Sequence, residues 1–147
     1  MLDAACQEAQ SFSSPPLLLA VTALTSLTDE EIQSIGVTEP MPKWVERLAE
    51  LAFQSGIRGL VASASELAML RRKFGCKLQF VIPGIRPAGT AVQDQSRIAT
   101  PAEAIRAGAD YLVVGRPILQ APDPVSAADS IAAEIGQASL EKAPGKW

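Results

Sequence analysis

Four short apolar runs alternate with amphipathic helical patterns, and this alternation constrains the fold more than any other feature of the chain. The runs are LLLAVTAL (17–24), GLVASA (59–64), LQFVIP (78–83) and YLVVG (111–115). Runs of this length that are apolar on both faces are typical of strands covered on both sides, as in a parallel sheet. The sequence therefore predicts the α/β class, built from parallel (β/α) units.

The helical patterns between these runs have clear boundary signals. Thr28 can cap a helix and Glu31 can complete a capping box with it, and Thr100 and Glu103 repeat this arrangement. Further helices are predicted over 42–56, 63–75, 100–108 and 123–136, and residues 138–147 are predicted to form a frayed tail.

The composition excludes several classes of function. The net charge of −3 gives no general attraction to nucleic acid or to an anionic membrane, and no apolar run approaches the ~18 residues of a membrane span. The chain has no histidine and no cluster of cysteines or carboxylates, so neither a metal nor another cofactor is predicted. Because the N-terminus does not resemble a signal peptide, we expect a cytoplasmic protein in which Cys6 and Cys76 are buried free thiols.

The turn after the third apolar run carries an arginine that a simple chain reversal does not need. This residue is Arg86, which lies in the sequence PGIRP at the start of a long loop, 84–99. Connections in (β/α) units usually have about two to six residues, and long loops at the carboxyl ends of parallel strands commonly carry binding groups. The loop is interpreted as an active-site lid, with a solvated surface loop as the alternative.

A second arginine follows the fourth run, in VVGRPI. Gly115 lets the backbone approach a ligand closely, and backbone N–H groups together with the Arg116 guanidinium could bind a phosphate. Four parallel strands make half of an eight-stranded barrel, in which phosphate commonly lies at the loops after the last two strands. If the third and fourth runs are the last two strands of such a barrel, Arg86 and Arg116 converge on one anion. The alternative is that Arg116 is an ordinary surface residue. Thr25, after the first run, could either reach a ligand or cap a helix.

Several motifs together resemble the orotidine 5′-phosphate decarboxylase family. They are AVTALTS, VIPGIRPAG, DQSRIATPAEAIRAGADYLVVGRPI and ADP, which follow the family's order and spacing over about residues 1–137. The resemblance implies that this region is the C-terminal half, strands five to eight, of a TIM (β/α)8 barrel. It also implies the decarboxylation of orotidine 5′-phosphate (OMP) to uridine 5′-phosphate (UMP), the last step of de novo pyrimidine synthesis.

The same resemblance implies five substrate-binding residues. Thr25 matches the hydroxyl residue near the pyrimidine, and Arg86 matches the arginine of the PGIR turn, which lies at the phosphate side of the ligand. Gln95 matches the lid glutamine that bridges phosphate and base, and Gly115 and Arg116 match the phosphate-binding pair after the last strand.

The catalytic residues of the family are not found in this chain. The resemblance implies an array of lysines and aspartates, in a D-x-K-x-x-D segment on the third strand with a lysine from the second, and none of the five lysines here stands in such an array. The array would stabilise a carbanion-like state at C6 of the pyrimidine. Arg86 and Arg116 cannot replace it, because guanidinium groups stay protonated. The alternative function is therefore a non-catalytic half-barrel that binds a nucleotide or phosphate.

A half barrel has exposed strand edges and an uncovered core face. Two copies could pair as a homodimer, or a separate N-terminal half could complete the barrel. We expect instead that the sequence is a fragment or a truncated gene product, because Met1 coincides with a plausible internal methionine of the longer domain.

Overall fold

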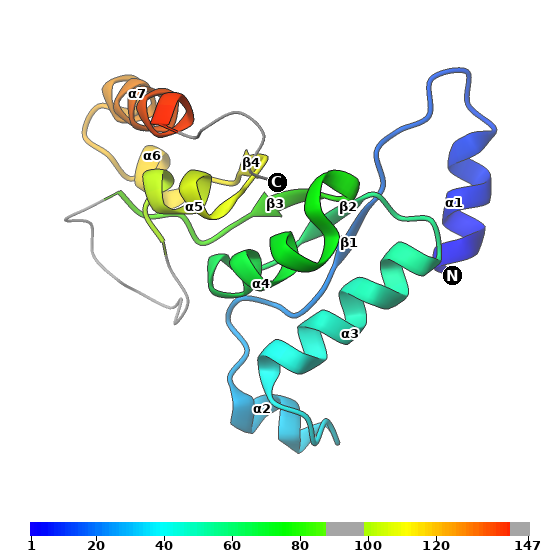
Figure 1. Cartoon of the computed structure of the whole chain (residues 1–147). Coiled ribbons are helices and arrows are strands. Elements are labelled where there is room, and N and C mark those ends of the chain that lie inside the picture. The colour runs from blue at the N-terminus through cyan, green and yellow to red at the C-terminus, as the bar shows by residue number, and fades with distance from the viewer. Residues whose placement is uncertain (88–98, 142–147) are drawn as a thin grey trace.

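A four-stranded parallel sheet forms the centre of the computed structural model, which describes residues 1–87 and 99–141 (Figure 1). The strands are β1 (Leu19–Val21), β2 (Gly59–Val61), β3 (Gln79–Ile82) and β4 (Tyr111–Leu112). They lie side by side in chain order, and each pairs in parallel with the next. The predicted α/β class with parallel (β/α) units is confirmed, although each strand is shorter than the apolar run that predicts it.

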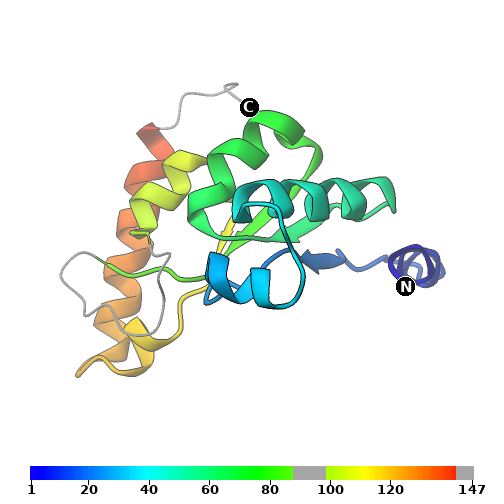
Figure 2. The ribbon, with the colours of Figure 1, turned by 90° about the horizontal axis from the view of Figure 1, so that it is seen from below.

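Helices fill the connections and flank both ends of the sheet. They are α1 (Leu2–Gln10), α2 (Asp29–Ser34), α3 (Met41–Gln54), α4 (Ala64–Phe74), α5 (Pro101–Ala107), α6 (Arg116–Leu119) and α7 (Pro124–Glu141), with a 3₁₀ turn, η1, over Gly75–Lys77. Figure 2 shows α3 and α4 together on one side of the sheet. Within the described residues, no helix is long and apolar enough to cross a membrane.

Capping side chains fix the helix starts where the sequence predicts them. The Thr28 hydroxyl accepts the Glu31 N–H, and the Glu31 carboxylate accepts the Thr28 N–H. The same reciprocal pair joins Thr100 and Glu103 at the start of α5. Asp123 Oδ1 accepts two backbone N–H groups at the start of α7, each at 3.1 Å. These three boundaries follow from local hydrogen bonds, and so the sequence alone predicts them.

The C-terminal end of α7 corrects the prediction of a frayed tail. The helix continues through Gly136 to Glu141, and Ala138 is only 1% exposed and belongs to the core. Contacts with α5 outweigh the low helix propensity of glycine, since the Glu134 carboxylate accepts the Ala102 N–H and Glu141 pairs with Arg106. Residues 138–141 are therefore helical, and the rest of the predicted tail lies outside the described residues.

In the part of the chain that the structure describes, the hydrophobic core lies between one face of the sheet and the helices. Leu60, Phe80 and Ile82 point toward the helices and are 0% exposed. Residues on the other face alternate with them, and Val21 and Tyr111 there are 57% and 53% exposed. The prediction that the strands are covered on both sides is wrong for residues 1–87 and 99–141, because their helices cover one face of the sheet. The expected uncovered face is confirmed.

No disulfide joins the two cysteines, as predicted, but neither thiol is buried. Cys6 is half-buried beside Gly56, and Cys76 in the 3₁₀ turn is exposed.

Candidate phosphate-binding site

The turn after β3 is shaped so that Ile85 enters the core and Arg86 leaves it. Gly84 has a φ of 77°, a left-handed conformation that favours glycine. Ile85 is 0% exposed and forms a parallel bridge with Ala99, whose carbonyl accepts the Arg86 N–H at 2.9 Å. The Arg86 side chain is held near the backbone by a 2.8 Å bond from Nη1 to the Ile85 carbonyl. The backbone of Arg86 is thus fixed at the carboxyl end of β3.

Arg116 starts α6 immediately after the neighbouring strand. The Val113 N–H bonds to the Ile82 carbonyl at 2.9 Å, so the pairing of β3 and β4 continues up to the turn. Gly115 then precedes the helix, and a Cβ atom at this position would meet no atom within 4 Å among the described residues. β3 and β4 are parallel neighbours, so their carboxyl ends lie side by side. Arg86 and Arg116 follow these ends and therefore lie at the same end of the sheet.

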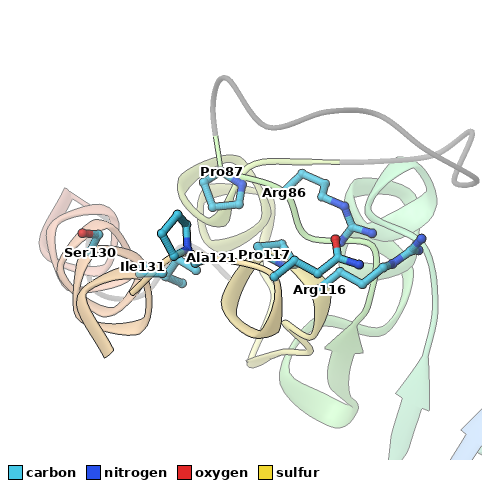
Figure 3. A pocket seen from close by; sticks show the side chains of 10 residues that line it. Arg86, Pro87, Arg116, Pro117, Ala121, Ser130 and Ile131 are labelled. Atoms are coloured by element: carbon cyan, nitrogen blue, oxygen red, sulfur yellow. The ribbon is translucent and has the colours of Figure 1, made fainter. Parts of the chain in front are cut away.

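Arg86 and Arg116 line one cavity of about 390 Å³. Figure 3 shows both side chains extending in the same direction, away from Ser130 and Ile131 on α7. The cavity has the size of a small-molecule site and combines a mainly apolar wall with a few polar groups, as such sites usually do. The apolar wall consists of Pro87, Pro117, Ala121, Pro122, Ala127 and Ile131.

The charge on the cavity wall favours an anion. Both charged side chains among its described lining residues are arginines, and the other polar side chains are those of Gln120 and Ser130. Guanidinium groups bind phosphate and carboxylate oxygens through charge-assisted hydrogen bonds, often in pairs. The structure places Arg86 and Arg116 on the wall of one cavity, and their convergence on one anion stays a prediction.

Gln120 is a lining residue that the sequence reasoning missed. Its backbone N–H bonds to the Arg116 carbonyl at 2.9 Å, which places it one helical turn after that arginine. A spacing of four residues puts two side chains on the same face of a helix, so this signal was present in the sequence. Ser130, by contrast, reaches the cavity only through the packing of α7, which no local pattern predicts.

The remaining predicted site residues are not brought into this cavity by the described structure. Thr25 is half-buried beyond the end of β1, the strand farthest from β4 in the sheet, and does not line the cavity. Gly115 adjoins it through Arg116 without being one of its lining residues. Gln95 lies outside the described residues, as does most of the loop interpreted as a lid.

A buried arginine aligns the two strands that carry the site. Arg71 on α4 is 3% exposed, and its Nη2 atom pairs with Asp110 Oδ2 at 2.6 Å. Asp110 stands just before β4, and the same carboxylate oxygen accepts the N–H of Phe80 in β3 at 2.7 Å. The Arg71 guanidinium also lies 4.4 Å from the centroid of the Phe80 ring. This network joins β3 to β4 and so helps to position Arg86 and Arg116.

The lysines of the described structure lie away from this cavity. Lys73 on α4 pairs with Glu46 at 2.8 Å and Glu50 at 3.2 Å on α3, and the hydrogen bond that Lys73 donates to Glu46 is the main cause that raises the Lys73 pKa. Lys43 and Lys77 are exposed. Within residues 1–87 and 99–141, no group of three or more His, Cys, Asp or Glu side chains could hold a metal ion.

Comparison with known proteins gives the family. The family model described as "Orotidine 5′-phosphate decarboxylase / HUMPS family" matches residues 1–131. The chain belongs to the orotidine 5′-phosphate decarboxylase family. It is 46% identical over 140 residues to the orotidine 5′-phosphate decarboxylase of Saccharophagus degradans and 52% identical over 120 residues to that of Trichlorobacter lovleyi. These matches cover 95% and 82% of this chain but only 59% and 50% of the relatives, so the chain spans little more than half their length.

Solved structures agree with this membership. The orotidine 5′-phosphate decarboxylase of Lactobacillus acidophilus matches with a TM-score of 0.77 and 35% identity, over 92% of this chain and 58% of that chain. The enzyme of Pyrococcus horikoshii, at 24% identity and a TM-score of 0.61, supports the fold alone. The four parallel strands described above therefore have the arrangement of strands in this family's barrels.

Proposed function

We propose that this chain supplies the phosphate-binding part of an orotidine 5′-phosphate decarboxylase and that it binds OMP and UMP through their phosphate. The observation that carries the proposal is the convergence of Arg86 and Arg116, from the ends of two neighbouring strands, on one cavity. In this assignment β1 to β4 are the fifth to eighth strands of the barrel, and residues 1–137 form its C-terminal half. As the family resemblance implies, Gly115 would bind the phosphate together with Arg116, Gln95 would bridge phosphate and base, and Thr25 would lie near the pyrimidine.

Binding and chemistry are separated in this proposal. Decarboxylation requires a positioned ammonium group that stabilises the carbanion-like carbon and delivers a proton, together with carboxylates that orient it. The described lysines lie on the helix side or at strand starts, and Lys73 is already paired with Glu46 and Glu50. We therefore expect the 147-residue chain to bind UMP without decarboxylating OMP, and the lysine–aspartate array to come from outside this chain. A non-catalytic nucleotide-binding role would give the same result for the chain alone.

The proposal is tested by calorimetric titration of UMP into the chain and into the Arg116→Ala variant. Hydrogen bonds to charged groups contribute about 1.5–3 kcal/mol each, which corresponds to a loss in affinity of about tenfold or more. Arg86→Ala should weaken binding to a similar extent, because its guanidinium would contact the same phosphate.

The matched control is Arg106→Ala. Arg106, like Arg116, lies on a short helix, but its guanidinium pairs with Glu141 at 2.7 Å and it does not line the cavity. This variant should bind UMP as the unaltered chain does. Equal affinities for all four proteins would show that the arginine cavity does not bind the phosphate.

A further inference from the structure

The register between β3 and β4 rests on a short strand. β4 contains only Tyr111 and Leu112, and its one neighbour in the sheet is β3, where Val81 lies opposite Tyr111. So short a strand forms few backbone hydrogen bonds, and register is specified weakly where the ladder is short. The alignment of the two strands should therefore depend on contacts beside the ladder.

Asp110 supplies such a contact directly before β4. Its backbone N–H donates to the Phe80 carbonyl at 3.0 Å, and its Oδ2 atom accepts the Phe80 N–H at 2.7 Å, so the two residues are joined in both directions. The same oxygen accepts Arg71 Nη2 at 2.6 Å, and Arg71 is 3% exposed. A movement of the carboxylate away from Phe80 would thus also leave a buried guanidinium without its charged partner, which is costly.

This contact stands in the same register as the two arginines of the cavity. Phe80 and Asp110 each lie six residues before the arginine that follows their own strand, Arg86 and Arg116 respectively. A slip of one residue would turn the β4 side chains to the opposite face, and a slip of two would displace Arg116 by about 6–7 Å relative to Arg86. Hydrogen bonds to one phosphate require donors within about 3 Å of its oxygens. A slip of either kind would separate the two guanidinium groups as partners of a single anion.

We infer that Asp110 is a positioning residue of the phosphate site, whose carboxylate oxygen fixes the register of β3 and β4 and so aligns Arg86 with Arg116. The inference rests on the proposed function, in which both arginines bind one phosphate. The carboxylate has two separable roles, as acceptor of the Phe80 N–H and as anionic partner of Arg71. The first sets the register, and the second stabilises the fold.

Two conservative variants separate these roles. Asp110→Asn keeps an acceptor at the same distance from the backbone and removes the charge, whereas Asp110→Glu keeps the charge and displaces the acceptor by one methylene group. Asp110→Asn should lower the Tm, because Arg71 loses its charged partner, and should still bind UMP nearly as the unaltered chain does. Asp110→Glu should bind UMP about tenfold more weakly, because one arginine loses its alignment with the other.

The affinities are measured by calorimetry at a temperature at which circular dichroism shows both variants folded. Equal affinities of the two variants, or weaker binding by Asp110→Asn, would overturn the inference, since the carboxylate would then act through its charge or through stability alone. The matched control is Asp29→Glu. Asp29 Oδ1 also joins two elements, because it accepts the Met41 N–H at 3.1 Å and so links α2 to α3, but it does not line the arginine cavity. This variant should bind UMP as the unaltered chain does.

A second readout tests the register without any nucleotide. The Val113 N–H bonds to the Ile82 carbonyl at 2.9 Å at the other end of β4, and its hydrogen exchange is measurable by NMR. Exchange at Val113 should be faster in Asp110→Glu than in Asp110→Asn, and unchanged in Asp29→Glu. Equal rates in the two Asp110 variants would refute the role in register, whereas a failure of the unaltered chain to bind UMP would refute the phosphate site.

Discussion

Replacing Arg71 with leucine should destabilise the protein more than any exposed arginine substitution. The guanidinium donates to the carbonyls of Gly75 at 2.7 Å and Leu78 at 3.1 Å, to the carbonyl of Gly108, and to the Asp110 carboxylate at 2.6 Å. The leucine would leave these acceptors without their donor. Removing one partner of a buried ion pair costs about 3–5 kcal/mol. Because the Asp110 side chain is 36% exposed and remains partly hydrated, we expect the lower end, about 3 kcal/mol.

The assay is thermal unfolding followed by circular dichroism, with Arg72→Leu as the control. Arg72 is the next residue on α4 and is exposed, so its loss should cost about 0.5 kcal/mol or less. For a protein of this size, 3 kcal/mol corresponds to a decrease in Tm of about 6–12 °C. If Arg71→Leu does not fold, Arg71→Lys, which keeps the charge but loses the planar set of donors, should show an intermediate decrease. A Tm for Arg71→Leu equal to that of Arg72→Leu would refute the account of this network.

Three further predictions concern the start and end of α5. Thr100→Ala should lower the free energy of unfolding by about 1 kcal/mol in urea titrations, because the Glu103 N–H loses its capping acceptor; an unchanged midpoint would contradict this. The backbone and side-chain hydrogen bonds of Thr100 lower the Glu103 pKa, so the stabilisation from this carboxylate is present above its unfolded pKa and is lost as the pH falls through the folded value. The gap in Tm between the unaltered chain and Glu103→Ala should therefore narrow from pH 7 toward acid, and a constant gap would argue against the charged cap. Gly108→Ala should destabilise by more than 1 kcal/mol, since Gly108 has a φ of 110° and the new Cβ would lie 3.0 Å from Arg71 Nε; a stabilised variant would contradict the structure at this turn.

Much of the fold could be predicted from the sequence because its signals are local. The capping boxes at Thr28 and Thr100 act over three residues and are found in the structure as predicted. The extent of α7 could not be predicted, since Gly136 favours a helix end and only the packing of Ala138 in the core overrides it. The uncovered face was expected from the resemblance to a barrel and not from the strand pattern, because an apolar strand such as the one containing Val21 has the same sequence whether or not another layer covers it.

In the candidate site, too, some features follow from sequence signals and others depend on the tertiary structure. That Arg86 and Arg116 line one cavity follows from the rule that neighbouring parallel strands bring their carboxyl ends together. Ser130 lines the cavity through tertiary packing that no spacing in the sequence reveals. Arg71 appears within an ordinary basic stretch at the end of a helix, and its burial depends on Asp110, which is 39 residues away in the chain.

The central claim is that this chain binds a nucleotide through its phosphate. The most direct measurement compares the affinities of UMP and uridine for the unaltered chain by calorimetry, because the two ligands differ only in the phosphate. The account predicts that UMP binds at least about tenfold more tightly than uridine, from one or more charge-assisted hydrogen bonds to the arginine cavity. Equal affinities for the two ligands would contradict it.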